Sequence, residues 1–168
     1  MVNLGQSVAR LPHRECAARA QPWPVNGQGV LLSGERLVAP YAAQALVLAH
    51  GFGQTRQAWG LTCRRLGAAG YDSTAFDARG HGQSGRNPAG VPYRVEQFMT
   101  DQACVAQSLP AQPVLIGASM GGLIGLLGQA QQPLYAAMVL VDIAPRWRPD
   151  GMERILDFMA AHPEGFDD

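Results

Sequence analysis

The stretch that decides the fold is residues 114–122, which reads Val-Leu-Ile-Gly-Ala-Ser-Met-Gly-Gly. Its first three residues are apolar and suit a strand that is buried on both faces. The next five match the pattern G-x-S-x-G, and apolar residues at helical spacing then continue as far as Pro133, which cannot continue a helix. The stretch therefore predicts a strand, a sharp turn and a helix, with the hydroxyl of Ser119 as a candidate nucleophile.

The position of this pentapeptide between a strand and a helix supports the prediction more than its residue types do. A chain with 20 glycines can contain G-x-S-x-G by chance, and the alternative interpretation is a Gly-rich turn without chemistry. In a strand-to-helix turn that carries a nucleophile, the residues two before and two after it must be small, because strand and helix nearly touch there. Gly117 and Gly121 meet that requirement.

Outward from this stretch, apolar runs alternate with segments of helical periodicity. Strands are expected at 45–49, 73–76, 114–116 and 137–141, and helices at about 57–66, 94–109, 120–132 and 152–161. The inner face of the helix 94–109 is expected to carry Val95, Phe98, Met99, Cys104 and Val105. This alternation predicts an α/β fold, with a mostly parallel sheet, helices on both faces, and functional residues at the carboxyl ends of the strands.

The parts of the chain before and after this core are predicted with less regular structure. Residues 1–24 are expected to form a poorly ordered N-terminal arm, 25–150 a partial α/β core, and 151–168 the start of a helical lid. Within 25–38, the apolar runs 30–32 and 37–38 flank Ser33-Gly34-Glu35, which is interpreted as the turn of a hairpin.

A second motif, His50-Gly51-Phe52-Gly53, follows the strand expected at 45–49. The backbone N–H of Phe52 could there face the Ser119 hydroxyl, and the N–H of Met120 lies at the start of the following helix. Two such donors would form an oxyanion hole. His50 is expected to be a structural imidazole bonded to loop backbone, and proton transfer is the less favoured alternative.

A third motif, residues 80–85, reads Gly-His-Gly-Gln-Ser-Gly and so also fits the dinucleotide-binding pattern G-x-G-x-x-G. That pattern requires a helix to begin at the third glycine, whereas Asn87, Pro88 and Pro92 delay the helix here. No cofactor is therefore expected. Asp77, Arg79 and His81 are expected to tie this loop down by hydrogen bonds and an ion pair.

Composition excludes several classes of partner. The 168 residues carry 13 basic and 13 acidic groups, so a polybasic surface for nucleic acid or anionic lipid is not expected. Apolar runs long enough for a membrane span and a secretory signal are both lacking, which favours a cytoplasmic protein with a small-molecule substrate. The cysteines and histidines are scattered, so no metal site is expected. These are Cys16, Cys63, Cys104, His13, His50, His81 and His162.

Taken in order, residues 46–52, 76–85 and 114–122 resemble the α/β-hydrolase superfamily, in its esterase, perhydrolase and C–C hydrolase-like branch. Together with residues 139–142, the resemblance covers roughly residues 29–165 and corresponds to the N-terminal portion of the family fold. It implies a serine nucleophile that transfers an acyl group to water. Epoxide hydrolases and haloalkane dehalogenases of this family carry aspartate at the matching position, so Ser119 favours ester-like carbonyl substrates.

In this fold the acid and the histidine of the catalytic triad follow the serine in the chain. Only residues 143–168 follow Asp142, and His162, the one histidine after Ser119, lies in the presumed lid. We therefore expect an incomplete serine hydrolase that is nearly inactive alone, with Asp142 structural rather than a displaced acid. The alternatives are a non-catalytic binding module that pairs through an open apolar strand edge at 137–141, and an active variant with an unorthodox base.

Overall fold

The structure is a computed structural model, and it describes residues 20–40, 42 and 44–143, together with the single residues Arg154, Asp157, Ala160 and Ala161. Elements alternate along the described chain in the expected order. They are β1 (Ala20–Pro22), β2 (Val25–Asn26), β3 (Leu31–Leu32), β4 (Gly34–Leu37), β5 (Ala45–Ala49), η1 (Arg56–Trp59), α1 (Gly60–Ala68), β6 (Asp72–Phe76), α2 (Val95–Gln107), β7 (Val114–Ala118), α3 (Met120–Gln131) and β8 (Ala137–Val141).

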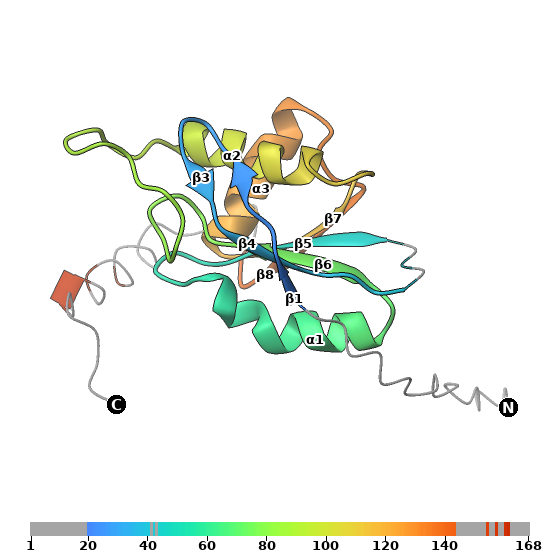
Figure 1. Ribbon diagram of the computed structural model, residues 1–168. Helices are drawn as coiled ribbons and strands as arrows, with labels where there is room; N and C mark the ends of the chain where they lie inside the picture. The colour runs from blue at the N-terminus through green and yellow to red at the C-terminus, as the bar shows by residue number, and fades with distance from the viewer. Residues whose placement is uncertain are drawn as a thin grey trace, which may run out of the picture.

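The main sheet has the strand order β1-β4-β6-β5-β7-β8. Strands β6, β5, β7 and β8 run parallel to one another, and β4 pairs antiparallel with both β1 and β6. Helix α1 covers one face of the sheet, and α2 and α3 lie side by side over the other (Figure 1). The mostly parallel sheet with helices on both faces confirms the predicted fold class.

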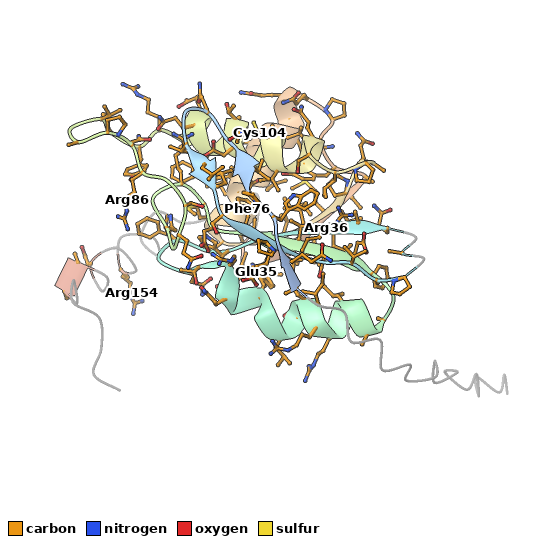
Figure 2. All side chains as sticks on the ribbon, viewed as in Figure 1. Glu35, Arg36, Phe76, Arg86, Cys104 and Arg154 are labelled. Carbon is orange, nitrogen blue, oxygen red and sulfur yellow. The ribbon has the colours of Figure 1, made fainter. Side chains whose placement is uncertain are left out.

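Two hydrophobic clusters fill the two layers. One contains Val47, Phe76 and Leu115 and packs under α2 and α3, and the other contains Leu46, Leu48 and Cys63 and packs against α1. Figure 2 shows these side chains, with Phe76 between the sheet and the helices above it. Because alternate residues of β5 enter opposite clusters, its continuous apolar run is required on both faces, as the sequence predicted.

The predicted N-terminal hairpin is wrong in its turn. Gly34 is a strand residue of β4 opposite Phe76, and β3 pairs with β2 in a separate two-stranded sheet. The turn lies earlier, where the Gly27 N–H donates to the Val30 carbonyl over 2.9 Å. Gly29 lies in this turn with a positive φ of 74°, whereas Gly34 is needed because a Cβ there would lie 2.7 Å from the carbonyl oxygen of Trp23.

The structure corrects the predicted boundary of the N-terminal arm. The predicted arm 1–24 extends too far, because Ala20, Gln21 and Pro22 pair with Leu37, Arg36 and Glu35 of β4. Residues 1–19 lie outside the described residues. So does the predicted lid segment 151–168, apart from the four single positions named above. None of the helices in the described part combines the length and apolar character that a membrane span requires.

The inner face predicted for helix α2 is confirmed except at Val95. Val95 is exposed, whereas Met99 and Val105 are buried as expected. The polar residues Asp101 and Gln102 are also buried on this helix. Their burial is possible because both side chains find partners in other elements, Asp101 in Arg79 and Gln102 in the carbonyl group of Gly121.

Strand β8 is an edge within the described part of the chain. It pairs with β7 alone there, through Val114↔Ala137 to Ala118↔Val141. Val139 is 49% exposed and Val141 is 40% exposed, although apolar side chains of a two-sided parallel strand are usually covered.

Candidate active site

Ser119 occupies a strained turn between β7 and α3. Its φ is 43° and its ψ is −113°, a conformation that L-residues rarely adopt. Asp142 is the other described non-glycine residue with positive φ. Strain of this kind costs about 1–3 kcal/mol and persists only where the surrounding structure enforces it. The described structure thus places the predicted nucleophile in a sharp strand-to-helix bend and partly exposes it.

Two glycines enforce this bend by close backbone contact. A Cβ on Gly117 would lie 2.5 Å from the Cα of Gly122, and a Cβ on Gly121 would lie 2.5 Å from the carbonyl oxygen of Ala49. Real Cβ atoms essentially never approach other atoms so closely. The strand, the turn and the neighbouring strand β5 therefore fit together only if residues 117 and 121 lack side chains, as the sequence predicted.

The loop after β5 lies beside Ser119, because a Cβ on Gly51 would be 3.5 Å from the Ser119 Cβ. Gly51 N–H donates to Gln54 Oε1 over 3.1 Å, and Gly53 N–H donates to His81 Nε2 over 3.4 Å. Within the described residues, the N–H groups of Phe52 and Met120 have no such partner.

Among the described residues, neither of the two N–H groups predicted as oxyanion donors is engaged in a hydrogen bond. No acidic residue lies in the first turn of α3 to oppose an anion there.

His50 is a structural imidazole, as expected. It is 2% exposed, its Nδ1 lies 2.7 Å from the carbonyl oxygen of Gly51, and its Nε2 accepts the Ala78 N–H over 3.0 Å. These partners fix the neutral tautomer with the proton on Nδ1. Burial lowers the pKa of His50, which keeps the ring neutral and joins the loop after β5 to the loop after β6.

The loop after β6 is fixed by buried charges. Asp77 is fully buried and accepts the N–H groups of Arg56 and Gln83 over 2.7 and 2.9 Å, and it forms an ion pair with the Arg56 guanidinium. The Ser84 hydroxyl donates to the Asp77 carbonyl over 2.6 Å. Gly82 is required because a Cβ there would collide with the Asp77 carboxylate.

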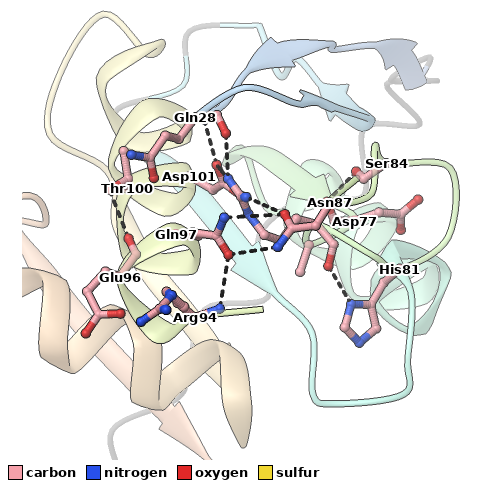
Figure 3. Close-up of polar contacts among 12 residues, drawn as sticks. Gln28, Asp77, His81, Ser84, Asn87, Arg94, Glu96, Gln97, Thr100 and Asp101 are labelled. Carbon is pink, nitrogen blue, oxygen red and sulfur yellow. Dashed lines mark hydrogen bonds and ion pairs between the residues drawn. The ribbon is translucent and has the colours of Figure 1, made fainter. Parts of the chain in front are cut away.

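Arg79 forms the second ion pair of this loop, with Asp101 of α2 (Figure 3). Its Nε and Nη2 donate to the two carboxylate oxygens over 2.6 and 2.7 Å, and both side chains are almost fully buried. Arg79 also donates to Asn87 Oδ1 and to the Gln28 carbonyl, each over 3.0 Å. His81 Nδ1 lies 3.0 Å from the Arg79 carbonyl oxygen.

The expectation that Asp77, Arg79 and His81 anchor this loop is therefore confirmed. The next helix begins at Val95, not at Gly85, so the loop also lacks the dinucleotide-binding context.

The sequence did not predict the two partners of these charges, Arg56 and Asp101, or the burial of Gln102. Arg56, Asp101 and Gln102 come from other elements, and each is buried. A signal existed for two of them, because positions 101 and 102 fall on the same helical face as the inward residues Phe98 and Val105. Within the described residues, no group of three or more His, Cys, Asp or Glu side chains is arranged to hold a metal ion.

Comparison with known proteins agrees with this architecture. A family model described as the alpha/beta hydrolase family matches residues 46–168. Monoacylglycerol lipase of Mycolicibacterium smegmatis is 38% identical over 100 residues, which are 56% of this chain and 36% of that protein.

Two solved structures show the same similarity. An alpha/beta hydrolase from Novosphingobium aromaticivorans superposes with a TM-score of 0.75 at 24% identity, over 84% of this chain and 50% of that one. Epoxide hydrolase A from Mycobacterium thermoresistibile superposes with a TM-score of 0.69 at 26% identity, over 82% and 45%. The chain thus spans half or less of the length of each of these proteins.

Proposed function

Because the chain belongs to the alpha/beta hydrolase family, we propose that it carries the nucleophile and oxyanion hole of a carboxylic-ester hydrolase. The observation that carries this proposal is the positive-φ turn at Ser119, beside two backbone N–H groups without partners in the described chain. A hydroxyl held in this way suits attack on a carbonyl carbon, and two convergent donors suit the oxygen that becomes negative.

The proposed reaction has two stages. Ser119 Oγ attacks the ester carbonyl carbon, its proton passes to a general base, and the N–H groups of Phe52 and Met120 receive the oxyanion. The bond to the alcohol then breaks, the alcohol leaves with that proton, and an acyl-enzyme remains. Water attacks the acyl group, so the acid is released and the Ser119 hydroxyl is restored.

A serine at this position supports esters over epoxides. The fold is shared with an epoxide hydrolase structure, so architecture alone does not separate the two reactions. The family resemblance implies aspartate as the epoxide-opening nucleophile, and this chain has a hydroxyl there instead. The relative named monoacylglycerol lipase is in line with an ester substrate.

In this proposal, the general base is a residue outside the described part. His50 and His81, the two histidines described, use both ring nitrogens for bonds to backbone groups. In subtilisin, loss of the histidine costs about 10⁶ in turnover, so the proposed turnover depends on a base other than His50 and His81.

A fluorophosphonate probe tests the nucleophile directly. We expect slow modification of the chain at Ser119, identified by peptide mass spectrometry, which Ser119→Ala abolishes and Ser108→Ala, at an exposed serine, does not. Labelling that survives Ser119→Ala would contradict the assignment. Steady ester turnover by this chain alone would show that a base lies within it, and His162→Ala would then identify or exclude that residue.

A second candidate function rests on the edge strand β8. The exposure of Val139 and Val141 favours strand addition by a second copy of the chain, with backbone hydrogen bonds along β8. We expect sedimentation to show concentration-dependent dimers that Leu140→Pro abolishes, because the Leu140 N–H points away from β7 and proline removes that donor. A monomer at all concentrations would eliminate this candidate.

A further inference from the structure

The first turn of α3 accepts a hydrogen bond from a buried side chain of α2. Gln102 Nε2 donates to the carbonyl oxygen of Gly121 over 3.0 Å, and the Tyr135 hydroxyl donates to Gln102 Oε1 over 3.2 Å. Gln102 and Tyr135 are 5% and 4% exposed. Gly121 is two residues after Ser119, so this chain of bonds ends directly beneath the strained turn.

Tyr135 fixes the direction of the Gln102 amide. Burial raises the pKa of Tyr135 far above its ordinary value, so the hydroxyl keeps its proton and acts as the donor to Oε1. A reversed amide would place Oε1 against the Gly121 carbonyl oxygen, two acceptors in contact with no proton between them. The orientation with Nε2 toward Gly121 is therefore the one that satisfies all three groups.

Water does not readily replace Gln102 at this point. The small cavity beside it has a volume of about 10 Å³ and is lined by Gln102, Gly121 and Met120 among others. That is at or below the roughly 10–15 Å³ that one water molecule needs. An apolar side chain of similar size at position 102 would thus leave the Gly121 carbonyl without this second donor.

We propose that Gln102 is a positioning residue that, together with Tyr135, sets the first turn of α3 and so the direction of the Ser119 side chain and the Met120 N–H. The inference rests on the proposed function in taking Ser119 as the nucleophile. The hydrogen bond to Gly121 holds one peptide group of the turn against α2. Asp101, the neighbouring residue, holds Arg79 in the same way, so α2 anchors the loops after β6 and β7 through consecutive residues.

A thiol at position 119 reports on this positioning without requiring turnover. A cysteine at a helix N-terminus has a lowered pKa, because the free N–H groups and the helix dipole stabilise the thiolate. In the Ser119→Cys chain, the pH dependence of iodoacetamide alkylation gives that pKa. Peptide mass spectrometry separates position 119 from the native thiols, of which burial raises the pKa of Cys63 and Cys104.

Adding Gln102→Met to that chain keeps side-chain length and helix propensity but removes the donor. We expect alkylation at position 119 and pH 7 to become roughly threefold to tenfold slower, since the thiolate loses aligned donors. Tyr135→Phe should slow it less, in the same direction, because the amide of Gln102 remains. Gln107→Met, at an exposed glutamine on the same helix, is the matched control and should leave the rate unchanged.

A Gln102→Met protein that is folded by circular dichroism and keeps the parent thiol pKa would overturn the proposal, because a purely structural glutamine alters stability alone. If Gln102→Met does not fold, the Tyr135→Phe chain decides in the same way. Failure of the proposed ester chemistry would appear separately, as absent fluorophosphonate labelling of Ser119, while the thiol pKa still tests the role of Gln102.

Discussion

The loops after β6 and β7 lie at the same edge of the sheet and are held by opposite means. The β6 loop is fixed by buried side-chain charges, with Asp77 on Arg56 and Arg79 on Asp101. The β7 turn is fixed by backbone contacts at Gly117 and Gly121, where only a hydrogen atom fits. A loop held by charge should respond to the loss of a charge, whereas a turn held by shape should respond to a single added methyl group.

This difference shows that the buried ion pairs and the candidate nucleophile lie in different loops. Buried ion pairs near a nucleophile would perturb its protonation, and both of these pairs lie in the loop that supports the site. The turn that carries Ser119 has no acidic residue in its first helical turn. Four substitutions or conditions test the contrast, and they follow in order of expected effect.

The largest effect is expected from Asp101→Asn, which leaves the Arg79 guanidinium buried without its counter-charge. Removing one partner of a buried pair costs about 3–5 kcal/mol in the free energy of unfolding, which urea denaturation measures. Glu96→Gln on the same helix is exposed and should change it by less than about 0.5 kcal/mol. The double substitution Arg79→Met with Asp101→Leu should cost far less than two single losses, and a fully additive result would contradict a buried coupled pair.

The next effect is expected from Gly117→Ala. The added methyl group meets Gly122 backbone atoms, which cannot move without displacing α3, so we expect a loss of about 2–3 kcal/mol in unfolding free energy. Gly60→Ala is the matched control, because its nearest neighbour would be Arg64 Nη1 at 3.8 Å and the residue is helical. That change should be neutral or stabilising by up to about 1 kcal/mol. Equal losses at both positions would refute the close-contact explanation.

A smaller effect of opposite sign is expected at Ser119. Ser119→Gly relieves a positive-φ conformation, so the unfolding free energy should rise by about 1 kcal/mol while fluorophosphonate labelling disappears. Ser119→Ala removes the nucleophile but retains the strain, and its stability should stay close to that of the parent. If glycine and alanine gave the same stability, the turn would not be strained.

The smallest effect is expected on the unfolding free energy when the pH is lowered. Because burial lowers the pKa of His50, the unfolded chain binds a proton more readily than the folded one, and the neutral form is the one that bonds Gly51 and Ala78. Stability from this group is therefore present above about pH 6.5 and is lost as pH falls below it. Denaturation curves between pH 7.5 and 5 should show this loss for the parent and a flatter profile for His50→Gln. Parallel profiles would contradict it.

The sequence predicted the parallel strands and the strained turn well, since both depend on local patterns. The run 45–49 is apolar at every position, and the structure places its strand at Ala45–Ala49. The N-terminal hairpin failed because Gly34 was interpreted as a turn residue, although it permits close approach of Trp23. Arg56 and Gln102 could not be assigned as partners, because Asp77 and Gly121 are distant in sequence and only the tertiary fold brings them together.

The way in which the bend at Ser119 is built has a consequence for evolutionary divergence. Main-chain contacts at Gly117 and Gly121 determine its shape, and no residue of the described part forms a hydrogen bond with the Ser119 hydroxyl. A codon change at 119 can therefore exchange one attacking atom for another while the scaffold stays intact. Lineages with different reaction types can in this way descend from one ancestral sheet, each by altering a residue that contributes little to folding.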